Sequence, residues 1–152
     1  MDEVREFETL VAEVEPRLRR ALIAALGSET GREATAEALG WAWQHRERLE
    51  GIGNKVAFLF RVGQSKSRRR KEPVLFAEPD HDEAWVEPGL APALASLSEP
   101  QRVAVVLVYG FRWTLREVAD LTGVRVTTVQ SHLERGLRKL RSALKVVSDV
   151  GT

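Results

Sequence analysis

An acidic, proline-rich stretch divides the chain into two parts. Between Glu72 and Ala93 the sequence carries six acidic residues, no Lys or Arg, and four of the six prolines. Proline cannot donate a backbone hydrogen bond and like charges repel one another, so such a stretch resists helix formation and packs poorly. It predicts a linker at 72–93 between two lobes, residues 1–71 and 94–152. Both lobes are mildly basic, so the overall charge of +1 arises from an uneven distribution.

The composition excludes several classes of protein. With 43% hydrophobic and 30% charged residues, the chain has the composition of a soluble globular protein. It contains no cysteine, which excludes disulfides and thiolate-ligated metal centres. The acidic N-terminus is no signal peptide, and the longest apolar run, at 103–109, is far shorter than the roughly 18 residues of a membrane span. We therefore expect a cytoplasmic protein without membrane insertion.

Apolar residues recur at helical spacing along the first lobe. The pattern over 4–27 predicts one helix, kinked or split at Pro16. A second helix is expected from about 31 to 49 and a third from about 55 to 70. No strand-like alternation occurs, so the sequence predicts an all-α fold made of two small helical domains.

The second lobe carries clearer helix signals. A capping box at 98–101, "SEPQ", opens one helix, and a second at 114–117, "TLRE", opens a short helix that Gly123 ends. A long helix follows, with a continuous apolar face from Val129 to Val147. The short helix, the glycine turn and the long helix are the pattern of a helix-turn-helix.

In a helix-turn-helix, the first helix supports the second, whose N-terminal residues enter the major groove of DNA. Arg and Gln can pair with purine edges, Glu accepts a hydrogen bond from cytosine, and Ser and Thr bind bases or phosphates. The alternative is that these are ordinary exposed polar residues of a helical bundle. The residues expected to face DNA are Arg125, Thr127, Thr128, Gln130, Ser131, Glu134 and Arg135.

Four motifs of the second lobe follow one another in the order found in a known family. They are "LASL", "SEPQR", "EVADLTG" and "VTTVQSHLER". The lobe resembles the C-terminal domain of bacterial sigma factors of the extracytoplasmic-function group. The first lobe resembles the family's other domain more loosely, through "REATAEALGWAWQHRERL" and "AFLFRVGQSKSRRRK". The resemblance implies a sigma-2-like helical bundle joined by the linker to a sigma-4-like helix-turn-helix.

The resemblance also implies a function. A sigma factor is not an enzyme: it binds core RNA polymerase and directs it to a promoter. The C-terminal lobe would bind the −35 element as duplex, and the N-terminal lobe would bind the −10 element as a single strand. Aromatic side chains stack on bases and cationic ones follow the phosphates. The residues assigned to the −10 strand are Asn54, Lys55, Phe58, Arg61, Ser65, Arg68, Arg69 and Arg70. For Phe58 the alternative is core packing, and for the basic run it is a solvated helix end.

The helix at 31–49 resembles the one that docks on the β′ clamp of polymerase, and the C-terminal lobe would meet the β flap. Trp41 and Trp43 cannot share a helix face. One is expected in the core and the other on the polymerase surface, to which Trp41 is assigned. The residues assigned to polymerase binding are Glu33, Glu37, Trp41, Gln44 and Arg48. An anti-sigma factor is a further candidate partner.

Within the long C-terminal helix, two residues depart from the family's common pattern. Many members have Arg or Lys at the position of Gln130, and an aromatic residue or His at that of Glu134, so the −35 sequence is expected to differ. No metal or cofactor is expected, because "DHDE" at 80–83 lacks defined geometry and no phosphate loop or nucleophile motif occurs. Two other readings stay open: a stand-alone helix-turn-helix regulator that does not engage polymerase, and a protein-interaction module such as a decoy for an anti-sigma factor.

Overall fold

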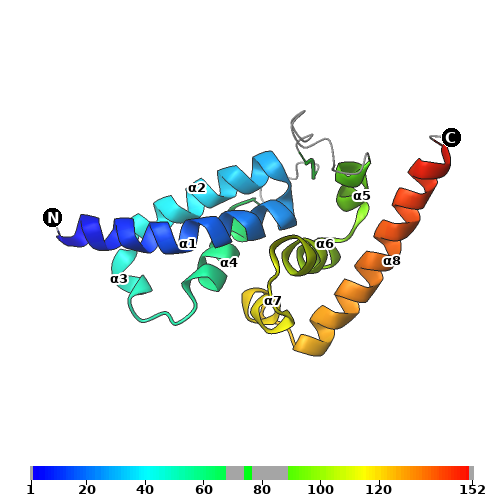
Figure 1. Cartoon of the computed structure of the whole chain (residues 1–152). Coiled ribbons are helices and arrows are strands. Elements are labelled where there is room, and N and C mark those ends of the chain that lie inside the picture. Colours follow the sequence, from blue (N-terminus) through cyan, green and yellow to red (C-terminus); the bar gives the residue numbers. More distant parts are fainter. Residues whose placement is uncertain (1, 68–73, 77–88, 151–152) are drawn as a thin grey trace.

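Helices make up the regular structure of the part of the chain that the computed structural model describes, which is residues 2–67, 74–76 and 89–150 (Figure 1). No strand occurs in these ranges, so the all-α prediction is confirmed. Most of the predicted linker lies outside them, including 77–88. None of the described helices combines the length and apolarity that crossing a membrane would require.

The described residues of the N-terminal lobe form four helices. They are α1 (Asp2–Leu26), α2 (Ser28–Gln44), α3 (Arg46–Leu49) and α4 (Lys55–Ser67). The helices α1, α2 and α4 pack around a core that includes Leu18, Leu22, Leu59 and Phe60, all at most 1% exposed. Pro16 was expected to kink or split this helix, and it does not split it: α1 is continuous through Pro16, with buried residues on either side.

The predicted helix at 31–49 is two helices, with the break at His45. The backbone of His45 has φ −119° and ψ 29°, which is not helical. Its ring stacks on Trp41 with centroids 4.3 Å apart, and ring atom Nδ1 lies 2.9 Å from the Trp41 carbonyl oxygen. The His45 ring therefore packs against the last turn of α2. The short helix α3 begins at the next residue.

Close contact between α1 and α2 depends on Gly31. A Cβ atom at Gly31 would lie 2.5 Å from the Cα of Ile23 and 2.7 Å from its nitrogen, both in the backbone of α1. These distances are shorter than any van der Waals contact, and backbone atoms cannot move aside as a side-chain tip can. The two helices therefore approach at a point where only glycine fits.

The C-terminal lobe follows the pattern predicted from its capping boxes. It consists of α5 (Leu90–Ser96), α6 (Glu99–Val105), the π-helical turn η2 (Val106–Gly110), α7 (Leu115–Thr122) and α8 (Val126–Val150). Both capping boxes are formed, and Gly123 is left-handed with φ 73°. The helix α5 begins within the stretch predicted as linker, and its Ala93 is buried.

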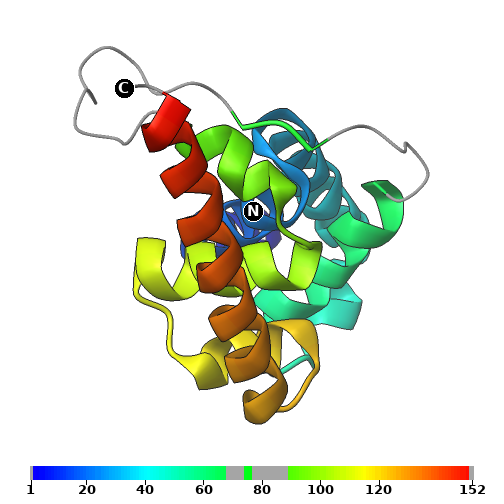
Figure 2. The same ribbon diagram turned by 90° about the vertical axis from the view of Figure 1, so that its right-hand side faces the viewer.

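The two lobes lie against each other. Helix α1 contacts α6 and η2, and α4 contacts α7 (Figure 1). We call this contact the seam: α1 and α4 on one side, with α6, η2, α7 and the loop between η2 and α7 on the other. Figure 2 shows that most of α8 lies on the side of the C-terminal lobe that faces away from the seam.

Candidate nucleic-acid interface

The helix-turn-helix has a small buried core. Val118 and Ala119 of α7 and Val129 and Leu133 of α8 are at most 9% exposed. Gly136 allows α8 to approach α6, since a Cβ there would lie 2.8 Å from Cγ2 of Val105. These contacts hold α8 by one face and leave the opposite face in solvent.

That outward face carries most of the residues predicted to contact the −35 duplex. Arg125 lies in the turn before α8, and the others lie in the first three turns of the helix. Thr128 is half-buried, whereas the other six are exposed. Residues three and four apart share a helix face. The structure therefore brings together five side chains on one face of α8, which are those of Thr127, Gln130, Ser131, Glu134 and Arg135.

The residues predicted to contact the −10 strand lie along α4 and the turn before it. The side chain of Asn54 caps α4, accepting a hydrogen bond from the Ala57 N–H at 3.0 Å. Phe58 is partly buried, with its ring 5.5 Å from that of Trp41. Arg61 and Ser65 are exposed, and Lys55 is half-buried. Arg68, Arg69 and Arg70 lie outside the described residues.

The residues predicted to bind polymerase follow one side of α2 and continue into α3. Glu33, Glu37, Trp41 and Gln44 are spaced four, four and three apart, which places them in one row. The guanidinium of Arg48 lies 5.7 Å from the ring of Trp41. Trp41 is the more buried of the two tryptophans. Trp43 is 37% exposed and packs edge-on against Phe7.

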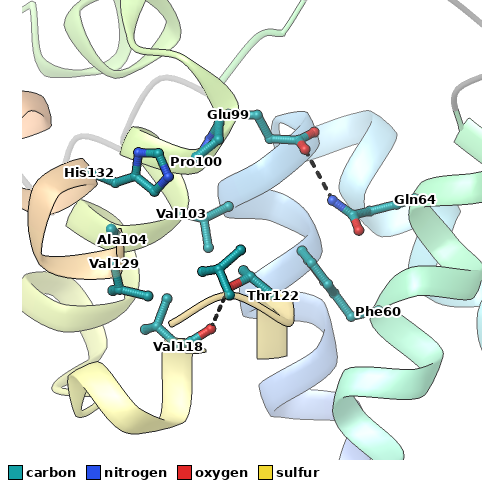
Figure 3. A pocket seen from close by; sticks show the side chains of 11 residues that line it. Phe60, Gln64, Glu99, Pro100, Val103, Ala104, Val118, Thr122, Val129 and His132 are labelled. Atoms are coloured by element: carbon teal, nitrogen blue, oxygen red, sulfur yellow. Dashed lines mark hydrogen bonds between the residues drawn. The ribbon is translucent and has the colours of Figure 1, made fainter. Parts of the chain in front are cut away.

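A cavity of about 200 Å³ lies in the seam (Figure 3). Phe60 and Gln64 line it from α4, Val103 from α6, and Thr122 and His132 from the helix-turn-helix. Its polar groups are largely paired: Gln64 donates to Glu99 at 3.1 Å, and Thr122 donates to the Val118 carbonyl at 2.8 Å. Within the described ranges no three His, Asp or Glu side chains converge to hold a metal ion, and "DHDE" at 80–83 falls outside those ranges.

Two arginines that no sequence pattern indicated join the lobes. Arg17 of α1 forms an ion pair with Glu117 of α7 at 2.5 Å, and its guanidinium stacks over Trp113. Arg102 of α6 is 2% exposed and donates to backbone carbonyls of α1. Burial lowers the pKa of Arg102, and Glu99 opposes that shift. Each arginine contacts residues of the other lobe that lie far away in the sequence. No local sequence pattern therefore identifies its role.

The pKa of Glu117 is held below its ordinary value of 4.5, first by the hydrogen bond from the Thr114 N–H and then by Arg17. A carboxyl with a lowered folded-state pKa stabilises the fold above its unfolded-state pKa, and the effect is lost as pH falls through the folded-state value. We expect Glu117→Gln to be less stable than the parent at pH 7, with the difference vanishing in acid. Urea unfolding between pH 7 and pH 3 measures this, and a constant difference would contradict it.

Comparisons with known proteins agree with this geometry. Residues 90–140 match the family model of sigma-70, region 4. The fold resembles the sigma factor RpoE from Bartonella quintana, solved with the anti-sigma factor NepR, at a TM-score of 0.72 and 22% identity, covering 93% of this chain and 98% of that one. It also resembles CnrH, solved with the cytosolic domain of CnrY, at a TM-score of 0.64 and 22% identity, covering 93% and 89%. A comparison with curated protein sequences found no match. The family match agrees with the resemblance of the C-terminal lobe, and both solved structures share the fold of the chain.

Proposed function

We propose that this chain, which has a sigma-70 region 4 domain in a sigma-factor fold, is a promoter-recognition sigma factor that binds core RNA polymerase and directs transcription initiation. The observation that carries the proposal is the outward face of α8, which lies within the region 4 match and presents five exposed polar side chains. The family acts by binding rather than by catalysis, and the proposed site of action is the cytoplasm.

The division of labour between the lobes is part of the proposal. The C-terminal lobe would read the −35 element with α8 and bind the β flap, and α4 with the turn before it would bind the −10 strand. The row on α2 and α3 would dock on the β′ clamp. The spacing of Glu33, Glu37, Trp41 and Gln44 supports this assignment, because a row along one helix face is what a partner helix can contact.

An anti-sigma factor is proposed as a regulatory partner. RpoE was solved with the anti-sigma factor NepR, and CnrH with the cytosolic domain of CnrY. Both neighbours have this fold over 93% of the chain. The similarity supports a protein inhibitor that binds the two-lobed form.

Transcription with purified core RNA polymerase tests the proposal. The promoter is first selected from a random DNA library with the reconstituted holoenzyme. We expect specific initiation only when this chain is added. A stand-alone regulator would bind duplex DNA but would fail to recover polymerase in a pull-down. A decoy would bind neither polymerase nor DNA.

Truncation of Gln130 or Arg135 to alanine is expected to weaken binding to the selected −35 duplex by about 1–3 kcal/mol each, with relaxed preference at one or two base pairs. Both side chains are exposed on the outward face of α8. Fluorescence anisotropy at fixed salt measures the effect. Lys145, an exposed cation near the other end of α8, provides the matched control, and Lys145→Ala should keep the sequence preference. Unchanged binding by both test variants would show that α8 reads DNA with another face.

A further inference from the structure

Hydrogen bonds on both sides of Ile52 fix the shape of the turn between α3 and α4, residues 50–54. The Ile52 N–H donates to the Leu49 carbonyl at the end of α3, at 3.0 Å. The Lys55 ammonium, at the start of α4, donates to the Ile52 carbonyl at 2.9 Å. The Ile52 side chain packs against the core, where Leu49 is only 1% exposed. One residue of the turn is therefore tied to the helices on both sides of it.

The side chain of Lys55 lies in acidic surroundings. It lines a crevice of about 280 Å³ that also has residues of α1 and α3 in its wall. Arg46, the other cation that lines the crevice, pairs with Glu3 at 3.3 Å. A phosphate group that approached Lys55 here would meet carboxylates, and like charges repel. The glutamates that line the crevice are Glu3, Glu6, Glu47 and Glu50.

Two exposed glycines stand on either side of Ile52. A Cβ atom at Gly51 or at Gly53 would meet no other atom within 4 Å. Neither residue has the left-handed φ that favours glycine, whereas Gly123 does. Glycine loses more backbone entropy on folding than any other residue. Neither the packing of this chain nor its backbone geometry therefore requires glycine at these two positions.

Glycine also serves where a ligand approaches the backbone closely. At an exposed glycine the peptide N–H and carbonyl can reach a base edge or a phosphate with no side chain between them. The turn lies at the lower edge of the N-terminal lobe in Figure 1 and leads directly into α4. The side chains proposed for the −10 strand continue along that helix, at Phe58, Arg61 and Ser65.

From these observations we infer that Lys55 is a positioning residue for the −10 strand and not one of its phosphate contacts. Its ammonium holds the Ile52 carbonyl, and this fixes the peptide groups of Gly51 and Gly53 where a nucleotide of the strand approaches them. The inference rests on the proposed function and divides the labour within it. Cations on the outside of α4, such as Arg61, bind phosphates, whereas Lys55 sets base preference through the shape of the turn.

The substitution Lys55→Met in reconstituted holoenzyme tests the inference, with the single-stranded −10 oligonucleotide of the selected promoter as the probe. We expect binding to weaken about tenfold and the preference at one base to relax, because the turn loses a charged hydrogen-bond donor. The salt dependence should keep the slope of the parent. Loss of a phosphate contact would instead lower that slope by about 0.7, the contribution of one contact to a single strand. Lys55→Arg should restore binding and base preference, because it keeps a cationic donor.

Two further sets of variants complete the test. Lys66→Met removes an exposed cation from the last turn of the same helix and should keep the base preference of the parent. Gly51→Ala and Gly53→Ala should each weaken binding of the −10 strand about tenfold, because the methyl group stands where the nucleotide approaches. Their stability in urea should not fall, since the added Cβ meets no atom of the protein.

A lowered salt slope with unchanged base preference in Lys55→Met would overturn the inference and make Lys55 a phosphate contact. Binding like that of the parent by Lys55→Met, or by both glycine variants, would overturn it too. If Lys55→Met does not fold, the glycine variants decide between the two outcomes. If the parent holoenzyme neither binds the −10 strand nor initiates at the selected promoter, the proposed function fails, and the role of Lys55 fails with it.

Discussion

Replacing Arg102 with methionine is expected to lower the free energy of unfolding by about 2–4 kcal/mol. Methionine keeps the length of the apolar stem but cannot donate. The carbonyls of Ala24, Ala25 and Leu97 would lose a charged donor at a site where Arg102 is only 2% exposed. The gain from no longer burying a charge offsets only part of that loss. Urea unfolding followed by circular dichroism measures the change.

The substitution Arg102→Lys separates the contribution of the positive charge to stability from that of the guanidinium geometry. Lysine keeps the positive charge but presents one nitrogen in place of the planar fork that reaches three carbonyls. An intermediate stability is expected, closer to methionine than to arginine. If the methionine variant unfolds within about 0.5 kcal/mol of the parent, the three hydrogen bonds contribute little beyond what water supplies.

Alanine at Gly31 is expected to destabilise the protein by about 2–3 kcal/mol. The added methyl group would meet the Ile23 backbone at 2.5 Å, so α1 and α2 must move apart, and the core between them must repack. Alanine has a higher helix propensity than glycine, which stabilises α2 slightly. The measured loss of stability is therefore the packing penalty minus this smaller gain.

The same helix provides the control for this substitution. Gly40 is exposed, and a Cβ there would meet nothing within 4 Å. Gly40→Ala should therefore raise the free energy of unfolding by up to about 1 kcal/mol. We expect Gly31→Ala to lower the free energy of unfolding and Gly40→Ala to raise it. Equal stabilisation by both would show that α1 and α2 relax apart at no cost.

What the sequence predicted correctly is encoded within a few residues. The capping boxes that begin at Ser98 and Thr114 satisfy the free N–H groups at the starts of α6 and α7 with side chains three residues away. Gly123 ends α7 by its own backbone preference. Each signal is complete in its local segment, so α6, α7, α8 and the outward face of α8 could all be predicted.

What the sequence did not predict depends on distant contacts. Pro16 breaks many helices, but in α1 the burial of residues on both sides outweighs the lost hydrogen bond. The break at His45 is an exception, because its ring stacks on Trp41 only four residues earlier, and no helix-ending residue in the sequence marked it. The partners of Arg102 are 77 and 78 residues away, and Arg17 and Glu117 are 100 residues apart. Nothing near these arginines distinguishes them from solvated ones.

Because the two lobes belong to one chain, weak contacts across the seam are enough to hold them together. Two lobes on one chain meet at an effective concentration on the order of 1 mM, whatever the concentration of the protein itself. Contacts that would give separate molecules a Kd of about 10 μM would then hold roughly a hundred closed chains for every open one. The balance between lobes in contact and lobes apart would therefore be independent of the protein concentration.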